Sequence, residues 1–148
     1  MYRRPLSQKG VPTTSSYNYD TVWEFKQLGP DQHHLALWKL LTTVNPDVVV
    51  CERFDSRPNI GGNGTVNLMA PEYIGVAKLY CTSAEKEIVL QQPSAAKGLW
   101  TDSKIKTLDL WQPNRKHAMD ALRHALYYLT ITQKEEYWVH QLRQAPHS

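Results

Sequence analysis

The stretch VVVCERFD, residues 48 to 55, decides the fold of this chain. Val48, Val49 and Val50 are β-branched residues in a short apolar run, which predicts a strand that is buried on both faces, as in a parallel sheet. The run ends abruptly at Glu52. In open α/β sheets, ligand sites form outside the carboxyl ends of the strands. Glu52 is therefore either an ordinary strand end exposed to water or a charged group that the fold places in a ligand site.

The regions around this strand alternate between strand and helix patterns. Alternating large apolar and polar residues predict a strand over residues 19–28, and helical spacing of apolar residues predicts a helix within residues 29–46 that ends at Asn45–Pro46. Further along, we expect a helix over residues 70–85, a strand over 86–93, short helical turns over 94–116 and a helix over 117–133. This order predicts an α/β domain around a partly parallel sheet.

Two of the predicted helices carry an apolar stripe that is expected to face the core. On the helix at 70–85 the inward residues are expected to be Ile74, Ala77, Leu79 and Cys81. On the helix at 117–133 they are expected to be Ala118, Ala121, Leu122, Ala125 and Leu129. The polar region after residue 137 is expected to be anchored by Trp138.

Composition describes an ordinary globular protein. With 148 residues, of which 41% are hydrophobic and 21% charged, the chain suits one domain with its own core. A net charge of +3 permits a nucleic-acid partner without requiring one. Cys51 and Cys81 lie in apolar runs and are expected to be buried thiols, which fits a reducing compartment. No apolar run approaches the length of a membrane span, so we expect a cytoplasmic protein.

Three polar residues share one face of the last predicted helix. His117, Asp120 and His124 fall within an arc of about 60°, beside the apolar stripe. A solvated helix edge would produce the same pattern, and Asp120 in the first turn would also suit the helix dipole. The alternative is a functional group of carboxylate and imidazole side chains at the rim of the buried surface.

A site led by carboxylates suits Mg²⁺ or Mn²⁺, whereas zinc would favour more histidine and cysteine ligands. The sequence has no C-x-x-C pair, no H-E-x-x-H, no phosphate-binding G-x-x-x-x-G-K-[ST] loop and no G-x-S-x-G elbow. A carboxylate-bound metal near lysines points to phosphodiester cleavage, in which the metal activates water and stabilises the leaving oxygen.

Four segments carry a resemblance to a known family: PDVVVCERFD, EYIGVAKLYC, QPSAAKG and RKHAMDALRHALYYL. In this order and spacing they resemble the RuvC-like nucleases of phages, relatives of the Holliday-junction resolvases with an RNase H fold. The similarity covers about residues 20 to 131. It implies an RNase H-like α/β fold with a mixed sheet flanked by helices. It also implies a Mg²⁺-dependent endonuclease (Mn²⁺ as a possible substitute) that acts on branched DNA as a homodimer.

The resemblance also implies roles for particular residues. Glu52, which ends the central strand, and His117 and Asp120 on the closing helix match the family's catalytic and metal-binding positions. The basic residues expected to contact DNA are Arg57, Lys97, Lys104, Lys106, Arg115 and Lys116. A solvated basic face is the other explanation for exposed lysines. Trp100 and Trp111 flank this cluster and are expected to be packing anchors rather than platforms for unpaired bases.

The sequence departs from the family at its beginning. Family members start with a strand that ends in a catalytic aspartate, and none of Asp20, Asp31 and Asp47 stands in that place. The first strand is therefore expected to be missing or replaced, through a late start, a truncation or a loss of catalysis. The expected organisation is a loose arm over 1–16, the nuclease domain over 17–135 and a tail over 136–148. The alternative function is an inactive RNase H-like module that binds branched DNA or a phage protein.

Overall fold

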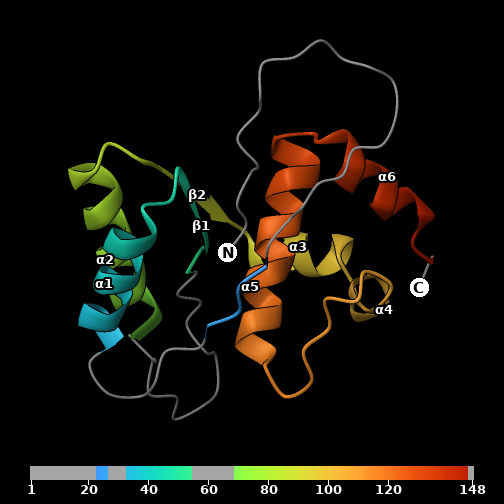
Figure 1. Ribbon diagram of the computed structural model, residues 1–148, viewed down its shortest axis with the longest axis horizontal. Helices are drawn as coiled ribbons and strands as arrows, with labels where there is room; N and C mark the ends of the chain where they lie inside the picture. Colours follow the sequence, from blue (N-terminus) through green and yellow to red (C-terminus); the bar gives the residue numbers. More distant parts are fainter. Residues whose placement is uncertain (1–22, 27–32, 55–68, 147–148) are drawn as a thin grey trace, which may run out of the picture.

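The computed structural model describes residues 23–26, 33–54 and 69–146. Its elements follow the order α1 (His33–Val44), β1 (Val48–Glu52), α2 (Met69–Ser83), β2 (Glu87–Gln91), α3 (Pro93–Leu99), α4 (Asp102–Lys106), α5 (Lys116–Tyr127), the π-helical turn η1 (Tyr128–Thr132) and α6 (Glu136–Gln144). Figure 1 shows α1 and α2 on one side of the strands and α3 to α6 on the other side. The protein is thus a three-layer α/β domain.

Strands β1 and β2 form the described part of the sheet, and they pair in parallel. Val49 and Cys51 of β1 contact the smaller core, which lies under α1 and α2, while Val48 and Val50 contact the larger core on the α5 side. This alternation follows from the period of two residues along a strand. The prediction of a parallel strand covered on both faces is confirmed.

The α1–α2 layer matches the predicted helices with one exception. Helix α1 ends before Asn45, which adopts φ 49°, a left-handed conformation that asparagine tolerates well. On α2, Ala77 and Cys81 are buried, but Leu79 is 62% exposed, so its predicted inward position is wrong. The reason is helical geometry, because Leu79 lies two positions from both buried residues and therefore on the opposite face.

Helix α5 lies in the middle of the second layer. Its buried apolar face is centred on Leu122 and Leu126, with Ala118 and Met119 at the edges. Ala121 is exposed, which corrects its predicted place on the inward stripe. It is turned about 100° from Leu122 and about 140° from Leu126, so it lies away from the buried face.

The chain after α5 contains structure that the sequence did not predict. The π-helical turn η1 follows α5 directly, and buried Thr130 in this turn accepts a hydrogen bond from Trp100 Nε1 at 3.2 Å. Helix α6 occupies most of the predicted tail, and its Trp138 is buried, as expected of an anchor. Trp23 packs edge-on against Trp138 at 5.7 Å between ring centroids.

Several predictions fall partly or wholly outside the described residues. Within the predicted strand at 19–28, Trp23 makes an isolated β-bridge, and Trp23 and Phe25 contact the larger core while Glu24 and Lys26 are exposed. The N-terminal arm, the place of a first strand and Arg57 all lie outside the described residues. In the part of the chain that is described, no helix has the length and apolar character needed to cross a membrane.

Candidate functional site

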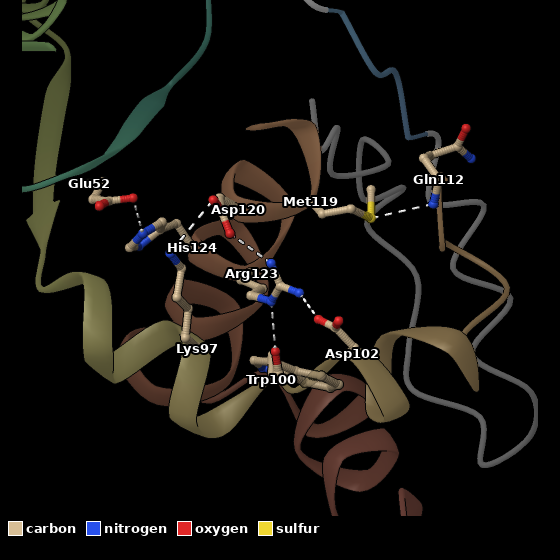
Figure 2. Close-up of polar contacts among 9 residues, drawn as sticks. All are labelled: Glu52, Lys97, Trp100, Asp102, Gln112, Met119, Asp120, Arg123 and His124. Carbon is tan, nitrogen blue, oxygen red and sulfur yellow. Dashed lines mark hydrogen bonds and ion pairs between the residues drawn. The ribbon is translucent and has the colours of Figure 1, made fainter. Parts of the chain in front are cut away.

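Two strand ends and one helix meet at the carboxyl edge of the sheet. Glu52 and Gln91 are the last residues of β1 and β2 and are partners in the parallel register. His124 of α5 reaches between them: its Nδ1 lies 2.8 Å from Gln91 Oε1, and its Nε2 lies 3.4 Å from Glu52 Oε2. Figure 2 shows His124 pointing at the Glu52 carboxylate. We call Glu52, Gln91 and His124 the strand-end cluster.

Two side chains of the strand-end cluster are buried, and their hydrogen bonds are incomplete. His124 is 3% exposed and Gln91 is 6% exposed, whereas Glu52 reaches solvent. Among the described residues, Nε2 of Gln91 and Nε2 of His124 are the buried side-chain atoms that have no hydrogen-bond partner. Nε2 of His124 lies 3.4 Å from Glu52 Oε2, close enough for Glu52 to act on the pKa of His124. Buried polar groups without a hydrogen-bond partner are costly and rare in folded proteins.

The pKa of His124 lies below its ordinary value. Burial lowers this pKa by penalising the charged imidazolium, and this effect exceeds the opposing attraction of Glu52 and Asp120. His124 is therefore a neutral imidazole at pH 7. Because an amide oxygen can only accept, Nδ1 carries the hydrogen that is donated to Gln91 Oε1.

A second network holds Asp120, one turn before His124 on α5. Asp120 Oδ1 accepts a hydrogen bond from Arg123 Nη1 at 2.7 Å, and Lys97 Nζ lies 3.7 Å from Asp120 Oδ2. Arg123, whose side chain is 9% exposed, also donates from Nε to the Trp100 carbonyl at 3.1 Å and from Nη2 to Asp102. Figure 2 shows these contacts joining α5 to the α3–α4 region. We call Asp120, Arg123 and Asp102 the arginine network.

A surface groove of about 540 Å³ runs past the arginine network. Its walls carry four cationic side chains and two carboxylates, an excess of two positive charges: Lys97, Arg115, Lys116 and Arg123 against Asp102 and Asp120. Trp111 and Met119 contribute apolar surface to the same groove. A groove of this charge suits a polyanion.

The structure describes each of the three residues that the sequence proposed as metal ligands. Glu52 and Asp120 both act electrostatically on His124, which links them to one region. His117 is exposed and makes no hydrogen bond or ion pair with a described residue. Within residues 23–26, 33–54 and 69–146, no three His, Cys, Asp or Glu side chains lie close enough together to hold a metal ion. The role predicted for His117 stays a prediction.

The residues predicted to contact DNA fall into two groups. Lys97, Arg115 and Lys116 line the groove. Lys104 instead donates to the Leu99 carbonyl at 2.9 Å, and Lys106 lies over the Trp111 ring at 4.8 Å from its centroid. Trp100 is fully buried, which confirms that it is a packing anchor, and Trp111 is half-buried.

Sequence reasoning did not assign roles to Gln91, Arg123 or His124. His124 was visible on the same helical arc as His117 and Asp120, but periodicity alone does not tell which histidine is buried. Gln91 could have been found as the last residue of the second strand, beside Glu52 in a parallel pair. Arg123 gave no signal, because its partners Trp100 and Asp102 come from a distant segment.

Comparison with solved structures now identifies the arrangement of these elements. RuvC from Thermus thermophilus in complex with a Holliday-junction substrate matches with a TM-score of 0.54 at 17% identity, over 77% of this chain and 80% of that chain. A second structure of Thermus thermophilus RuvC matches with a TM-score of 0.53 at 17% identity, over 77% of this chain and 79% of that one. This chain has a RuvC-like fold. The prediction of an RNase H-like α/β architecture is confirmed.

At 17% identity, the likeness to RuvC shows the fold alone. Neither the protein-family models nor the curated proteins gave a match to this sequence. What the site does therefore has to be argued from the described residues.

Two groups near the carboxyl edge of the sheet would suit a divalent cation. Glu52 and Asp120 supply carboxylate oxygens, which Mg²⁺ and Mn²⁺ prefer. Asp120 is already paired with Arg123 and Lys97, and the described residues bring no three such ligands together.

Proposed function

We propose that this protein is a Mg²⁺-dependent, structure-selective endonuclease that hydrolyses phosphodiesters in branched DNA, such as a four-way junction. The observation that carries the proposal is the meeting of Glu52 and Asp120 around His124 at the carboxyl edge of the sheet, beside a groove with excess positive charge. The RuvC-like fold supports the same reading. We further propose that the protein acts as a homodimer, which suits the two-fold symmetry of a junction.

Each group has a separate task in this proposal. Glu52 and Asp120 would hold the metal, which would supply an activated water and stabilise the leaving oxygen. Lys97, Arg115 and Lys116 hold the phosphate backbone along the groove. His117 is exposed at the start of α5 and is free to pass a proton to the leaving oxygen. Arg123 has every nitrogen engaged, so it orients Asp120 and does not contact DNA.

Cleavage of a synthetic four-way junction in Mg²⁺ tests the proposal. Glu52→Gln and Asp120→Asn keep the size of each side chain but remove its charge, and each is expected to lower the rate at least about 100-fold. Glu87→Gln and Asp109→Asn change exposed carboxylates away from the strand-end cluster and serve as matched controls. Cleavage that survives in both Glu52→Gln and Asp120→Asn would exclude these residues as metal ligands.

A second candidate function is an inactive RNase H-like module that binds branched DNA or a protein partner. The observation in its favour is that Asp120 is already neutralised by Arg123 and Lys97, and that the described residues hold no three-ligand group. This candidate predicts salt-dependent binding of junctions by the wild-type chain with no cleavage in Mg²⁺ or Mn²⁺. The nuclease candidate predicts both binding and cleavage.

A further inference from the structure

The two tryptophans that flank Lys104 and Lys106 differ in their surroundings. Trp100 is fully buried, and its Nε1 donates a hydrogen bond to Thr130 Oγ1 at 3.2 Å. Trp111 is half-buried, because it packs against the larger core and also lines the groove beside the arginine network. Trp100 is therefore a packing anchor, whereas Trp111 presents aromatic surface to the groove.

The segment that carries Trp111 is fastened to α5. The backbone N–H of Gln112 donates to Met119 Sδ at 3.4 Å, a contact that Figure 2 shows. Asp109 and Asn114, on either side of Trp111, adopt φ 55° and φ 64°, left-handed conformations that Asp and Asn tolerate. Trp111 is thus held in place without a ligand, so that stacking on its ring costs little conformational entropy.

Lys106 covers one part of the Trp111 ring. Its Nζ lies 4.8 Å from the ring centroid, which is a cation–π contact. Lys106 is not among the residues that line the groove, so the ring surface that it covers is turned away from the groove. The surface of Trp111 on the groove side is left to a ligand.

The groove combines this aromatic surface with exposed cations. Arg115 and Lys116 are exposed among its lining residues, and Met119 adds apolar surface beside Trp111. The volume of about 540 Å³ lies within the range of about 300–1,000 Å³ that is typical of ligand pockets. Proteins that bind single-stranded nucleic acid use the same combination, in which cations hold the backbone and aromatic rings stack on the bases. In a duplex each base is already stacked between its neighbours, so an aromatic wall adds nothing to duplex binding.

We propose that Trp111 is a stacking platform for an unpaired base, and that the groove therefore selects branched DNA with unpaired nucleotides over fully paired DNA. The inference rests on the proposed nuclease function, because it specifies the kind of branched DNA that this groove binds. Arg115 and Lys116 hold the phosphates next to the stacked base. The charge of the groove sets the affinity for any DNA, whereas Trp111 sets the preference for unpaired strands.

Binding of a dT oligonucleotide without Mg²⁺, followed by fluorescence anisotropy, tests the inference. Trp111→Leu keeps an apolar side chain but removes the aromatic ring, so dT affinity is expected to fall about 5- to 100-fold. The slope of log K against log salt is expected to stay the same, because no charge is lost. Trp111→Phe keeps an aromatic ring and is expected to keep most of the affinity. A duplex of equal length is expected to bind equally well to Trp111→Leu and to the wild type.

Trp38→Leu is the matched control, because Trp38 is a half-buried tryptophan of α1 that does not line the groove. This variant is expected to bind dT as the wild type does. Circular dichroism and the urea unfolding midpoint check that each variant is folded. Wild-type affinity for dT in Trp111→Leu, or an equal loss for dT and duplex, overturns the inference. A failure of the wild-type chain to bind dT also overturns it.

A measurement on the wild-type chain does not depend on the folding of variants. ¹H–¹⁵N correlation spectra resolve the indole N–H of each tryptophan, and a base stacked on Trp111 is expected to shift the Trp111 resonance during a dT titration. The resonance of buried Trp100, which donates to Thr130, is the internal control and is expected to stay in place. A Trp111 resonance that does not move while dT binds overturns the inference.

The outcomes separate this inference from the proposed function. If the wild type cuts a four-way junction but Trp111→Leu binds dT normally, the inference is wrong and the nuclease function stands. If dT binds through Trp111 but no junction is cut in Mg²⁺, the inference stands and the nuclease function is wrong. When both hold, Trp111→Leu lowers the cleavage of a junction with unpaired nucleotides more than the cleavage of a fully paired junction.

Discussion

The strand-end cluster and the arginine network lie on the same helix and differ in how completely their polar atoms are satisfied. In the arginine network, Nε and both terminal nitrogens of Arg123 have acceptors, and Asp120 has a cation at each oxygen. In the strand-end cluster, the described residues leave two buried nitrogens without a hydrogen-bond partner. A network whose polar atoms all have partners within the protein stabilises the fold, whereas a buried polar group that lacks a partner is where a ligand is expected to bind.

The largest effect is expected from breaking the complete network. Arg123→Gln leaves the half-buried Asp120 without its main partner, and the free energy of unfolding is expected to fall by about 3–5 kcal/mol. Urea unfolding measures this change. Arg115→Gln removes an exposed cation from the same groove and is expected to stay within about 0.5 kcal/mol of the wild type. Equal losses of unfolding free energy in Arg123→Gln and Arg115→Gln would contradict the special role of the arginine network in stability.

Breaking the incomplete cluster is expected to affect metal binding more than stability. Gln91→Leu removes the acceptor that holds His124 beside Glu52, so the Mg²⁺ affinity of the proposed site is expected to fall about 10- to 100-fold. The unfolding free energy is expected to change less than in Arg123→Gln, because the substitution also removes the unsatisfied Nε2 of Gln91. Calorimetric titration and urea unfolding of the same sample give both values. A large loss of stability with unchanged Mg²⁺ affinity would mean that Gln91 has a structural role only.

The opposite face of β1 offers a pH-dependent control for the strand-end cluster. Burial, helped by the nearby Cys81, raises the pKa of Cys51 from 9.0 to about 11. The folded state thus holds the thiol proton more tightly than the unfolded state does. This contribution to stability is complete below pH 9, decreases as the pH rises toward 11, and amounts to about 2 kcal/mol.

Cys51→Ala isolates this contribution from that of other groups that titrate at high pH. Unfolding free energies at pH 8 and pH 10.5 are expected to differ less in Cys51→Ala than in the wild type. Mg²⁺ affinity at pH 8 is expected to be unchanged in this variant, because Cys51 faces α1 and α2 rather than α5. An equal pH dependence in both proteins would show that the thiol titrates alike in the folded and unfolded states.

The smallest expected effect belongs to the groove. Lys116→Ala removes one phosphate contact, so junction affinity is expected to fall several-fold and the slope of log K against log salt to shrink by about 0.9. Lys104→Ala is the comparison, because Lys104 already donates to a backbone carbonyl and does not line the groove. Fluorescence anisotropy at several salt concentrations measures both slopes. A larger change of the salt slope in Lys104→Ala than in Lys116→Ala would mean that the DNA does not follow the groove.

The sequence predicted the order of helices and strands well, because local periodicity sets each of them. The strand at Val48 to Glu52, the end of α1 at Asn45 and the broken helices α3 and α4 were all expected. The errors concern which face of a helix is buried, because Leu79 and Ala121 were expected inside and are exposed. An apolar residue on a helix does not reveal whether a neighbouring element covers its side of the helix.

The sequence indicated two residues of the candidate site, Glu52 and Asp120, but not the residues that surround them. Glu52 was found because it follows a β-branched run, and Asp120 because it shares an arc with two histidines. Helix α6 and the arginine network were not predicted, since the partners of Arg123 and Trp138 are distant in the sequence. Contacts between residues that are far apart in the sequence leave no periodic pattern, so sequence periodicity cannot reveal them.

The sequence by itself determined that a carboxylate would end a core strand and that His117, Asp120 and His124 would share one face of a helix. Only the tertiary structure decided which histidine meets the carboxylate. Periodicity fixes the angle of a side chain around the helix axis, whereas the position along the axis that is buried depends on where the helix crosses the sheet. Helix α5 crosses the ends of β1 and β2 at His124, so this ring is buried beside Glu52 and His117 remains in solvent.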